Sequence, residues 1–243
     1  MQITASTKVG DIATNIPASL SVFERYGVDF CCGGQAPLEQ ALSDKGISVG
    51  DLIVEIEQAQ QAQKDEDELH EDWSLMSPSG LVDHIEHAHH AFLRDQLPRA
   101  GAELATVIGV HGENHPELWE IGRIYDGMRK ELETHLLKEE QHLFPAIRAL
   151  ETLRDSNGDS AGDSPEAQTL AAGMKELEAE HDAVGQALHK LHELTFSYQA
   201  PPDACITFSG VYRRLMELEA DVHRHVHLEN NILIPAVREL LAT

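Results

Sequence analysis

Two segments of the chain carry histidine and glutamate at the same spacing. Residues 135–150 read HLLKEEQHLFPAIRAL, and residues 225–240 read HVHLENNILIPAVREL. Aligned without gaps, both begin with histidine, have glutamate four residues later, and then have a proline, which usually ends a helix. Imidazole and carboxylate groups bind metals, and a spacing of four residues places both on one face of a helix. The repeat therefore predicts two matched metal-binding helices.

A comparison of heights extends this set to four predicted helices. In an antiparallel bundle, residues equally far from a turn lie at the same height. His90 lies 21 residues before the predicted end of its helix at 111, and His135 lies about 20 residues after the next helix begins near 115. His181 lies 16 residues after Pro165, where the third predicted helix begins. The predicted layer comprises His90, His135, Glu139, His181, His225 and Glu229.

Burying four imidazoles and two carboxylates in a bundle core would be costly without a compensating partner. Two metal ions would offset this cost if each ion binds two imidazoles, both carboxylates bridge the two ions, and an oxide, hydroxide or water lies between them. Mixed imidazole and carboxylate ligation favours non-haem iron over manganese or zinc. The order His-x-x-x-Glu differs from the Glu-x-x-His of ferritin-like bundles. We therefore expect a di-iron centre with room for a small diatomic ligand. The competing interpretation, ordinary contacts on solvated helices, explains neither the repeat nor the layer.

Other histidines and acids near this layer are weaker candidates. His111 is 21 residues from His90, about 31 Å along a continuous helix, so it reaches the layer only if Pro98 breaks that helix. A shift of register from His90 to His87 is the second alternative. The acids around His181, at positions 178, 180 and 182, are candidate acceptors for imidazole N–H groups, with at least two of them expected on the solvated surface.

Adjacent Cys31 and Cys32 lie on a glycine-rich bend, in DFCCGGQ, ahead of a predicted helix. Neighbouring cysteines rarely form a relaxed disulfide, and backbone N–H groups before a helix favour thiolate by lowering the thiol pKa. Two thiolates here could hold iron transiently or donate electrons; two small buried thiols are an equally good interpretation. The third cysteine, Cys205, is interpreted as structural, and three cysteines exclude a four-thiolate cluster within one chain.

The patterns that must position these groups are helical throughout. Residues 1–62 predict a small domain of short helices, and residues 63–77 an acidic linker. Residues 78–243 predict an all-α, up-down-up-down four-helix bundle. Its helices are expected at about 79–111, 117–154, 165–198 and 203–241.

Composition narrows the possible partners. The 42 acidic and 18 basic residues give a formal net charge of −24, which disfavours binding to nucleic acid or to an anionic membrane surface. No window is apolar for the length of a membrane span, and the N-terminal residues have no apolar signal region. Three cysteines, two of them adjacent, form no disulfide framework, so we expect a cytoplasmic protein.

The sequence GVDFCCGG ahead of HLLKEEQHLFP and HVHLENNILIP resembles the repair-of-iron-centres family over nearly the whole chain. These are haemerythrin-like di-iron bundles fused to a small domain containing cysteine. The resemblance implies a stress protein that restores iron–sulfur clusters damaged by nitric oxide or peroxide, with a labile di-iron site as iron source. It places the same six ligands at the positions chosen above and the cysteine motif at Cys31 and Cys32. It also implies damaged iron–sulfur proteins as clients and a homodimer, and it supplies a histidine matching His111.

Two other functions compete with iron-centre repair. The first is nitric oxide reduction at the di-iron pair, with electrons passing through Cys31 and Cys32, which would make the protein an enzyme. The second is oxygen binding or sensing, as in simple haemerythrins, against which the cysteine domain argues. Nitric oxide and oxygen are thus the small ligands we consider.

Overall fold

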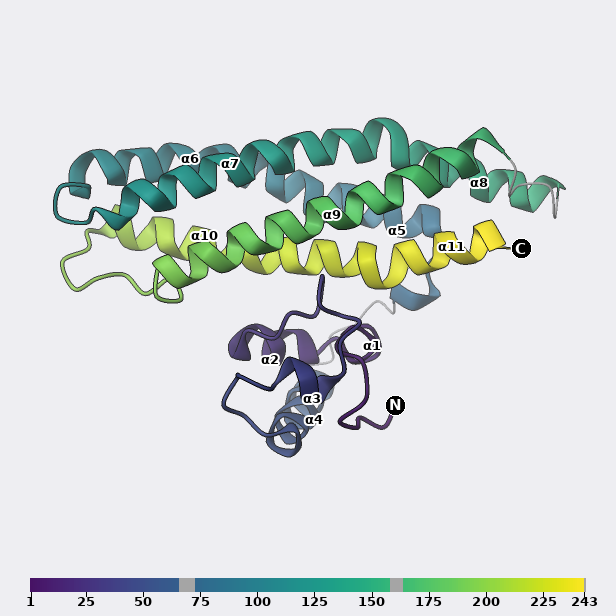
Figure 1. Ribbon diagram of the computed structural model, residues 1–243, viewed down its shortest axis with the longest axis horizontal. Helices are drawn as coiled ribbons and strands as arrows, with labels where there is room; N and C mark the ends of the chain where they lie inside the picture. Colours follow the sequence, from purple (N-terminus) through teal and green to yellow (C-terminus); the bar gives the residue numbers. More distant parts are fainter. Residues whose placement is uncertain (66–72, 158–163, 243) are drawn as a thin grey trace. The chain divides into compact units, whose positions relative to one another are not determined.

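The computed structural model describes residues 1–65, 73–157 and 164–242, and every regular element in these ranges is helical (Figure 1). The described chain separates into two compact units. One is Val82–Val222, and the other combines Met1–Leu81 with His223–Thr243. The all-α prediction is confirmed. No helix among the described residues is long and apolar enough to cross a membrane.

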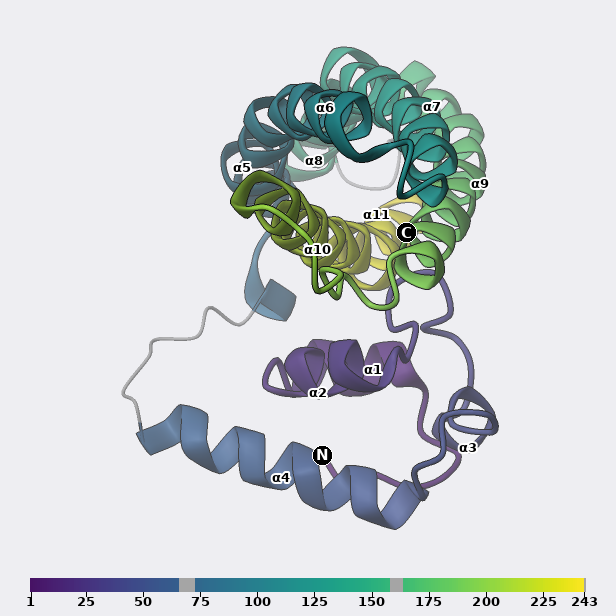
Figure 2. The ribbon, with the colours of Figure 1, turned by 90° about the vertical axis from the view of Figure 1, so that its left-hand side faces the viewer.

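Helices form the unit of residues 82–222. They are the end of α5 (Pro78–His84), then α6 (Ala91–His111), α7 (Glu117–Lys138), α8 (Phe144–Asn157), α9 (Pro165–Leu194) and the first part of α10 (Ile206–Leu228). The view along the helices shows α6, α7, α9 and α10 arranged around a common core (Figure 2). Tyr125 on α7 donates a hydrogen bond to the Leu97 carbonyl on α6, and Lys138 on α7 contacts Glu176 on α9. These helices therefore pack along their lengths.

The core of this unit follows from apolar residues at every third or fourth position. On α6 the buried set is Leu93, Leu97, Ala100, Leu104 and Val107. α7, α9 and α10 repeat this spacing, so each helix turns one apolar stripe inward. Pro98 lies within α6, and the helix continues through it to His111. The alternative in which Pro98 breaks the helix and returns His111 to the metal layer is therefore wrong.

Among the described residues, three π-helical turns interrupt the helices, and sequence periodicity did not predict them. They are η2 (Ile85–His90), η3 (Glu139–Leu143) and η5 (Glu229–Leu233). The N–H of Phe144 bonds to the carbonyl of Glu139, and that of Ile234 to the carbonyl of Glu229, each five residues back. A proline follows immediately in both cases, at the second position of α8 and of α11 (Ile234–Ala242). A proline at the start of a helix breaks no backbone bond, so neither proline ends the helix there.

Helix ends agree with the sequence at some points and differ at others. Ser164 caps α9 by accepting a hydrogen bond from the N–H of Ala167 at 3.1 Å, and Pro165 begins the helix as expected. α9 was predicted to reach Tyr198 but ends at Leu194. Residues 196–198 have φ values of 50°, 58° and 59°, so the chain turns left-handed and cannot continue the right-handed helix.

The other unit contains the N-terminal helices, whose bounds are Val9–Asn15 (α1), Ser19–Tyr26 (α2), Leu38–Ala41 (α3), Val49–Asp65 (α4) and Trp73–Leu75 (η1). Gly27 ends α2 with a φ of 59°, a conformation that glycine adopts without strain. The helix α4 continues to Asp65, so the start of the predicted acidic linker at residue 63 is helical. The centre of that predicted linker, residues 66–72, lies outside the described residues.

The contacts of His115, in the turn between α6 and α7, predict how the stability of the fold depends on pH. Its Nε2 lies 3.0 Å from Asp203 Oδ2, and its Nδ1 lies 3.0 Å from Glu117 Oε1. Hydrogen bonds to Asp203 and then to Glu117 raise the pKa of His115. The folded state thus holds this proton more tightly than the unfolded state, whose histidine has a pKa of about 6.5. The resulting stability is complete below that pH and is lost as pH rises through the folded-state pKa.

We therefore expect His115→Gln to lower the free energy of unfolding more at about pH 5.5 than at about pH 8.5. Chemical denaturation at both pH values measures this difference. His189→Gln, at an exposed histidine of α9, is the control and should show a smaller change with pH. An equal effect of His115→Gln at both pH values would contradict the assignment.

Candidate metal centre

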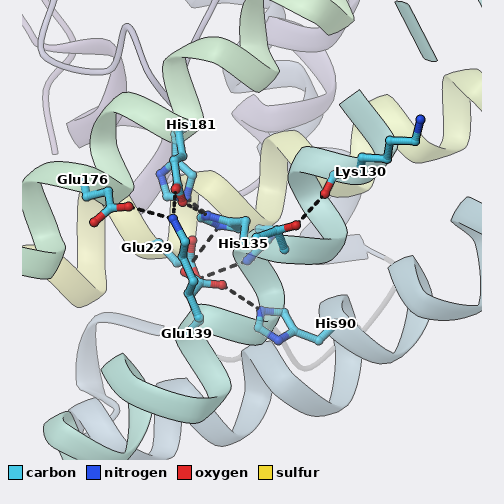
Figure 3. Close-up of polar contacts among 11 residues, drawn as sticks. His90, Lys130, His135, Glu139, Glu176, His181 and Glu229 are labelled. Atoms are coloured by element: carbon cyan, nitrogen blue, oxygen red, sulfur yellow. Dashed lines mark hydrogen bonds and ion pairs between the residues drawn. The ribbon is translucent and has the colours of Figure 1, made fainter. Parts of the chain in front are cut away.

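Four of the sequence-predicted ligands meet inside the unit of residues 82–222. His90 ends η2, His135 lies in the last turn of α7, Glu139 begins η3, and His181 lies in the middle of α9. All four are buried, with at most 2% of each residue exposed. Figure 3 shows their side chains pointing toward one another. The helices thus bring together one imidazole each, as the height comparison required.

The carboxylate of Glu139 lies between two imidazole groups. Its Oε1 is 3.4 Å from His135 Nε2, and its Oε2 is 3.3 Å from His90 Nε2. His181 Nε2 is 3.2 Å from His135 Nε2. Ligand atoms of His135, Glu139 and His181 all lie within 4.8 Å of one another, close enough to share one cation. Glu139 therefore lies within reach of both imidazoles, one at each carboxylate oxygen.

Carboxylates hold the outer nitrogens of two of these imidazoles. His90 Nδ1 lies 2.7 Å from Glu140 Oε1, and His135 Nδ1 lies 2.9 Å from Glu180 Oε2. An Nδ1–H donated outward leaves the lone pair of Nε2 directed at the centre, the tautomer that a metal ligand needs. The sequence had proposed Glu180 among three candidates for this role. It missed Glu140, whose partner is 50 residues away in sequence.

Basic side chains hold these two outer carboxylates in turn. Arg94 donates to Glu140, and Lys138 donates to Glu180. Partial burial opposes ionisation of Glu140 and Glu180, but the hydrogen bonds from Arg94 and Lys138, and then from the imidazoles, outweigh it and lower the pKa of both acids. Both therefore remain carboxylates able to accept the imidazole N–H.

The remaining predicted ligands lie at the end of α10 and at the start of η5. His225 and Glu229 are fully buried, and His225 Nε2 lies 3.1 Å from Glu229 Oε1. The pair His135 and Glu139 has the same spacing and a similar separation. In both pairs the glutamate begins a π-helical turn that a proline-containing helix follows. The two repeated segments thus have the same local structure as well as the same residues.

The donor chemistry fits iron. Neutral imidazole together with carboxylate is typical of non-haem iron sites. The four buried candidate ligands in the unit of residues 82–222 present only nitrogen and oxygen atoms. Burial of an ionised glutamate such as Glu139 is costly, and a bound cation would offset that cost. The structure therefore supports a cation site with iron chemistry.

Two family models match this chain. Residues 81–237 match the hemerythrin HHE cation binding domain, and residues 5–60 match a domain of unknown function, DUF542. The iron-sulfur cluster repair protein ScdA of Staphylococcus haemolyticus is 33% identical, over 95% of this chain and 97% of its own length. This chain belongs to the family of the iron–sulfur cluster repair proteins. The resemblance inferred from the sequence is confirmed.

Further members of the family match over a similar length. A probable iron-sulfur cluster repair protein of Haemophilus influenzae is 31% identical, over 96% of this chain and 97% of its own. The iron-sulfur cluster repair protein YtfE of Escherichia coli O157:H7 is also 31% identical, over 93% of this chain and 94% of its own. Both parts of the chain, the cysteine domain and the helical bundle, are thus present in these relatives.

Cys31 and Cys32 form a second cluster with Asp29, which the sequence analysis did not single out. The two sulfurs are 3.8 Å apart, and Cys31 Sγ lies 3.3 Å from Asp29 Oδ1. Ligand atoms of all three residues lie within 4.8 Å of one another. Thiol and carboxylate groups are ligands that divalent metals use in proteins. Neither cysteine is in a disulfide.

The predicted lowering of the thiol pKa is wrong for Cys31. The hydrogen bond with Cys32, burial and the nearby Asp29 carboxylate raise the pKa of the Cys31 thiol well above its usual value. The N–H groups of Cys31 and Cys32 bond to Asp29 Oδ1, at 3.1 and 2.9 Å, so they do not stabilise a thiolate. The following helix α3 has only four residues and so contributes little dipole.

The π turn η5 and the end of α10 contact the segment that carries Cys31 and Cys32. Asn231 donates hydrogen bonds to the carbonyls of Phe30 at 3.1 Å and Cys31 at 3.3 Å. A Cβ atom at Gly34 would lie 2.6 Å from Asn231 Oδ1, so only glycine allows this approach. Phe30 also meets the edge of His227, at 5.7 Å between ring centres, and burial lowers the pKa of His227 to about 4. The histidines flanking His225 thus serve packing between this helix and the cysteine segment.

Other histidines have contacts away from the centre. His87 is exposed, and its Nδ1 lies 2.7 Å from the Asp83 carbonyl, so the shifted register to His87 is wrong. His111 lies at the end of α6, where its Nε2 is 3.2 Å from Cys205 Sγ. Cys205 in turn accepts a hydrogen bond from the N–H of Phe208 at 3.4 Å, a structural contact at the start of α10.

Proposed function

We propose that this protein repairs damaged iron–sulfur clusters by supplying ferrous iron from a labile di-iron centre. The observation that carries this proposal is the placement of Glu139 between His90 and His135, each within 3.4 Å, inside a bundle of the hemerythrin type. Relatives that align over nearly the whole chain are named for iron–sulfur cluster repair. Iron–sulfur proteins are accordingly the proposed clients.

The proposed ligands are those of the sequence analysis: His90, His135, Glu139, His181, His225 and Glu229. We propose that they hold two iron ions, with Glu139 and Glu229 as bridges and an oxide or hydroxide between the ions. When bound, the ions supply a redox-active, exchangeable iron pair. The chain supplies imidazole lone pairs fixed by Glu140 and Glu180, and helices that exclude bulk water from the buried carboxylates.

Cys31 and Cys32, with Asp29, are the proposed acceptor of iron during hand-over to a client. Their three ligand atoms are closely grouped, and Cys32 is partly accessible to solvent. Three ligands leave coordination positions open for a client's own thiolates, which suits a transient holder better than a permanent site. Cytoplasmic location and a homodimer remain predictions from the sequence.

Metal analysis with an optical spectrum tests the centre. We expect about two iron ions per chain and the absorption bands of an oxo-bridged pair in the oxidised protein. The iron-loaded protein should then restore a cluster-deficient iron–sulfur protein, measured by the return of the acceptor's cluster absorption. One zinc ion per chain, or no metal, would overturn the assignment. Iron binding without transfer to the acceptor would leave the centre but remove repair as its function.

A further inference from the structure

A pocket of about 340 Å³ lies between α7, η3 and α9, and it leads to the candidate centre. Its lining includes the buried Glu139, which contacts His90 and His135, together with Glu176 and Glu180 of α9. Glu176 is exposed, whereas Glu180 is partly buried. Carboxylates thus occur at the surface, at intermediate depth and at the bottom of the same pocket.

Lys138 is held between the two outer carboxylates of this pocket. Its Nζ lies 2.6 Å from Glu176 Oε1 and 2.5 Å from Glu180 Oε1. These two hydrogen bonds raise the pKa of Lys138, so the side chain is an ammonium ion. The ammonium therefore occupies a position between two carboxylates, where it is held by charge-assisted hydrogen bonds.

The pocket is connected to the centre by direct contacts. The second oxygen of Glu180 accepts a hydrogen bond from His135 Nδ1 at 2.9 Å, and His135 Nε2 faces Glu139. Gly173 of α9 lets this helix approach η3 closely, because a Cβ atom there would lie 2.9 Å from Leu143 Cδ1. Both Gly173 and Leu143 line the pocket.

We propose that this pocket is the passage through which ferrous iron enters and leaves the centre, with Lys138 as its gate. The inference rests on the function proposed above. The ammonium of Lys138 leaves Glu176 and Glu180, and these two carboxylates hold the cation on its way to or from Glu139. The step exchanges one cation for another: the hydrogen bonds of Lys138 to Glu176 and Glu180 break, and no proton and no electron is transferred. Lys138 then returns and shields the buried carboxylate from solvent cations.

A simpler role for Lys138 is to link α7 to α9 through surface ion pairs. Exposed pairs of this kind contribute about 0–1 kcal/mol to stability. That role predicts a small loss of stability in variants of Lys138. Because Lys138 also keeps Glu180 ionised for His135, this role allows faster iron release when Lys138 is replaced, but not slower release when Glu176 is replaced. Kinetics of iron release therefore separate the two roles.

The experiment uses the full chain loaded with ferrous iron under anaerobic conditions and mixed with an excess of a coloured ferrous chelator. Lys138→Met removes the competing cation, and we expect iron release to be about fivefold faster because two carboxylates then face the ion alone. Glu176→Gln removes one of these carboxylates while Lys138 keeps Glu180, and we expect release to be about fivefold slower. Loading of the apoprotein with ferrous iron should change in the same directions.

Lys190 and Glu193 provide matched controls. They form an exposed ion pair of 3.0 Å on the same helix, α9, outside this pocket. Lys190→Met and Glu193→Gln should leave the release rate at the wild-type value. Equal rates in the pocket variants and the control variants would overturn the passage. If all variants then kept about two iron ions and their spectrum, the di-iron centre would stand. Failure of the wild-type protein to bind ferrous iron would overturn both proposals.

Discussion

Glu139→Leu is expected to lower iron affinity by at least about 100-fold, more than the loss of an outer hydrogen-bonding partner causes. One carboxylate oxygen faces His135 and the other faces His90, so this substitution removes an oxygen from the neighbourhood of both imidazoles. Leucine has a similar size and is apolar, which suits a buried position. Iron content after dialysis against a weak chelator and the intensity of the oxo-bridge bands measure the effect.

Glu131→Leu, at an exposed position of α7, is the matched control and should keep the iron content of the wild-type protein. The helical content of both variants should be unchanged in circular dichroism. A Glu139→Leu variant that binds as much iron as the control, with the same optical bands, would rule out Glu139 as a bridge.

The second large effect is expected at the cysteine pair. Replacing Cys31 and Cys32 together by serine should slow iron transfer to a cluster-deficient acceptor by a factor of at least about 10. The reason is that the serine hydroxyl is a much weaker ligand for iron than thiolate. Iron content and the optical spectrum of the centre should stay at wild-type values. The measurement is the rate at which cluster absorption returns in the acceptor.

Cys205→Ser is the control for this variant. Cys205 lies beside His111 in the unit of residues 82–222 and is exposed, so its loss should not affect transfer. Asp29→Asn keeps the backbone hydrogen bonds possible but removes the carboxylate charge, and we expect an intermediate rate. Wild-type transfer rates in the double serine variant would remove these cysteines from the hand-over.

Periodicity and repeat together were enough to predict the helices and to bring His90, His135, Glu139 and His181 to one level. Apolar residues at every third or fourth position define which face of each helix is inward, and the distance from a turn defines the height. Both the spacing of apolar residues and the distance from a turn can be read directly from the sequence. The structure places these four side chains together, and their role as ligands stays a proposal.

Other features depend on contacts that sequence spacing does not reveal. The hydrogen bond from His90 to Glu140 joins residues on different helices, and the side-chain register that allows it depends on the π turns. The thiol environment of Cys31 was misjudged because backbone N–H groups that could have stabilised a thiolate are taken by Asp29. A signal for the latter existed in DFCC, since aspartate commonly bonds to the backbone two residues ahead.

The π turns limit which deletions the sequence can tolerate during evolution. A π turn accommodates one residue more than an α turn does, and it carries less favourable backbone hydrogen bonds. Deleting a single residue within 139–143 would remove this extra residue and let regular α-helix form, which changes the directions of the side chains within the turn relative to the helix that follows. Glu139 would then no longer share its orientation with the segment that follows it. Helix regularity and the aim of the carboxylate are therefore opposing demands, and lineages that retain iron should retain the extra residue.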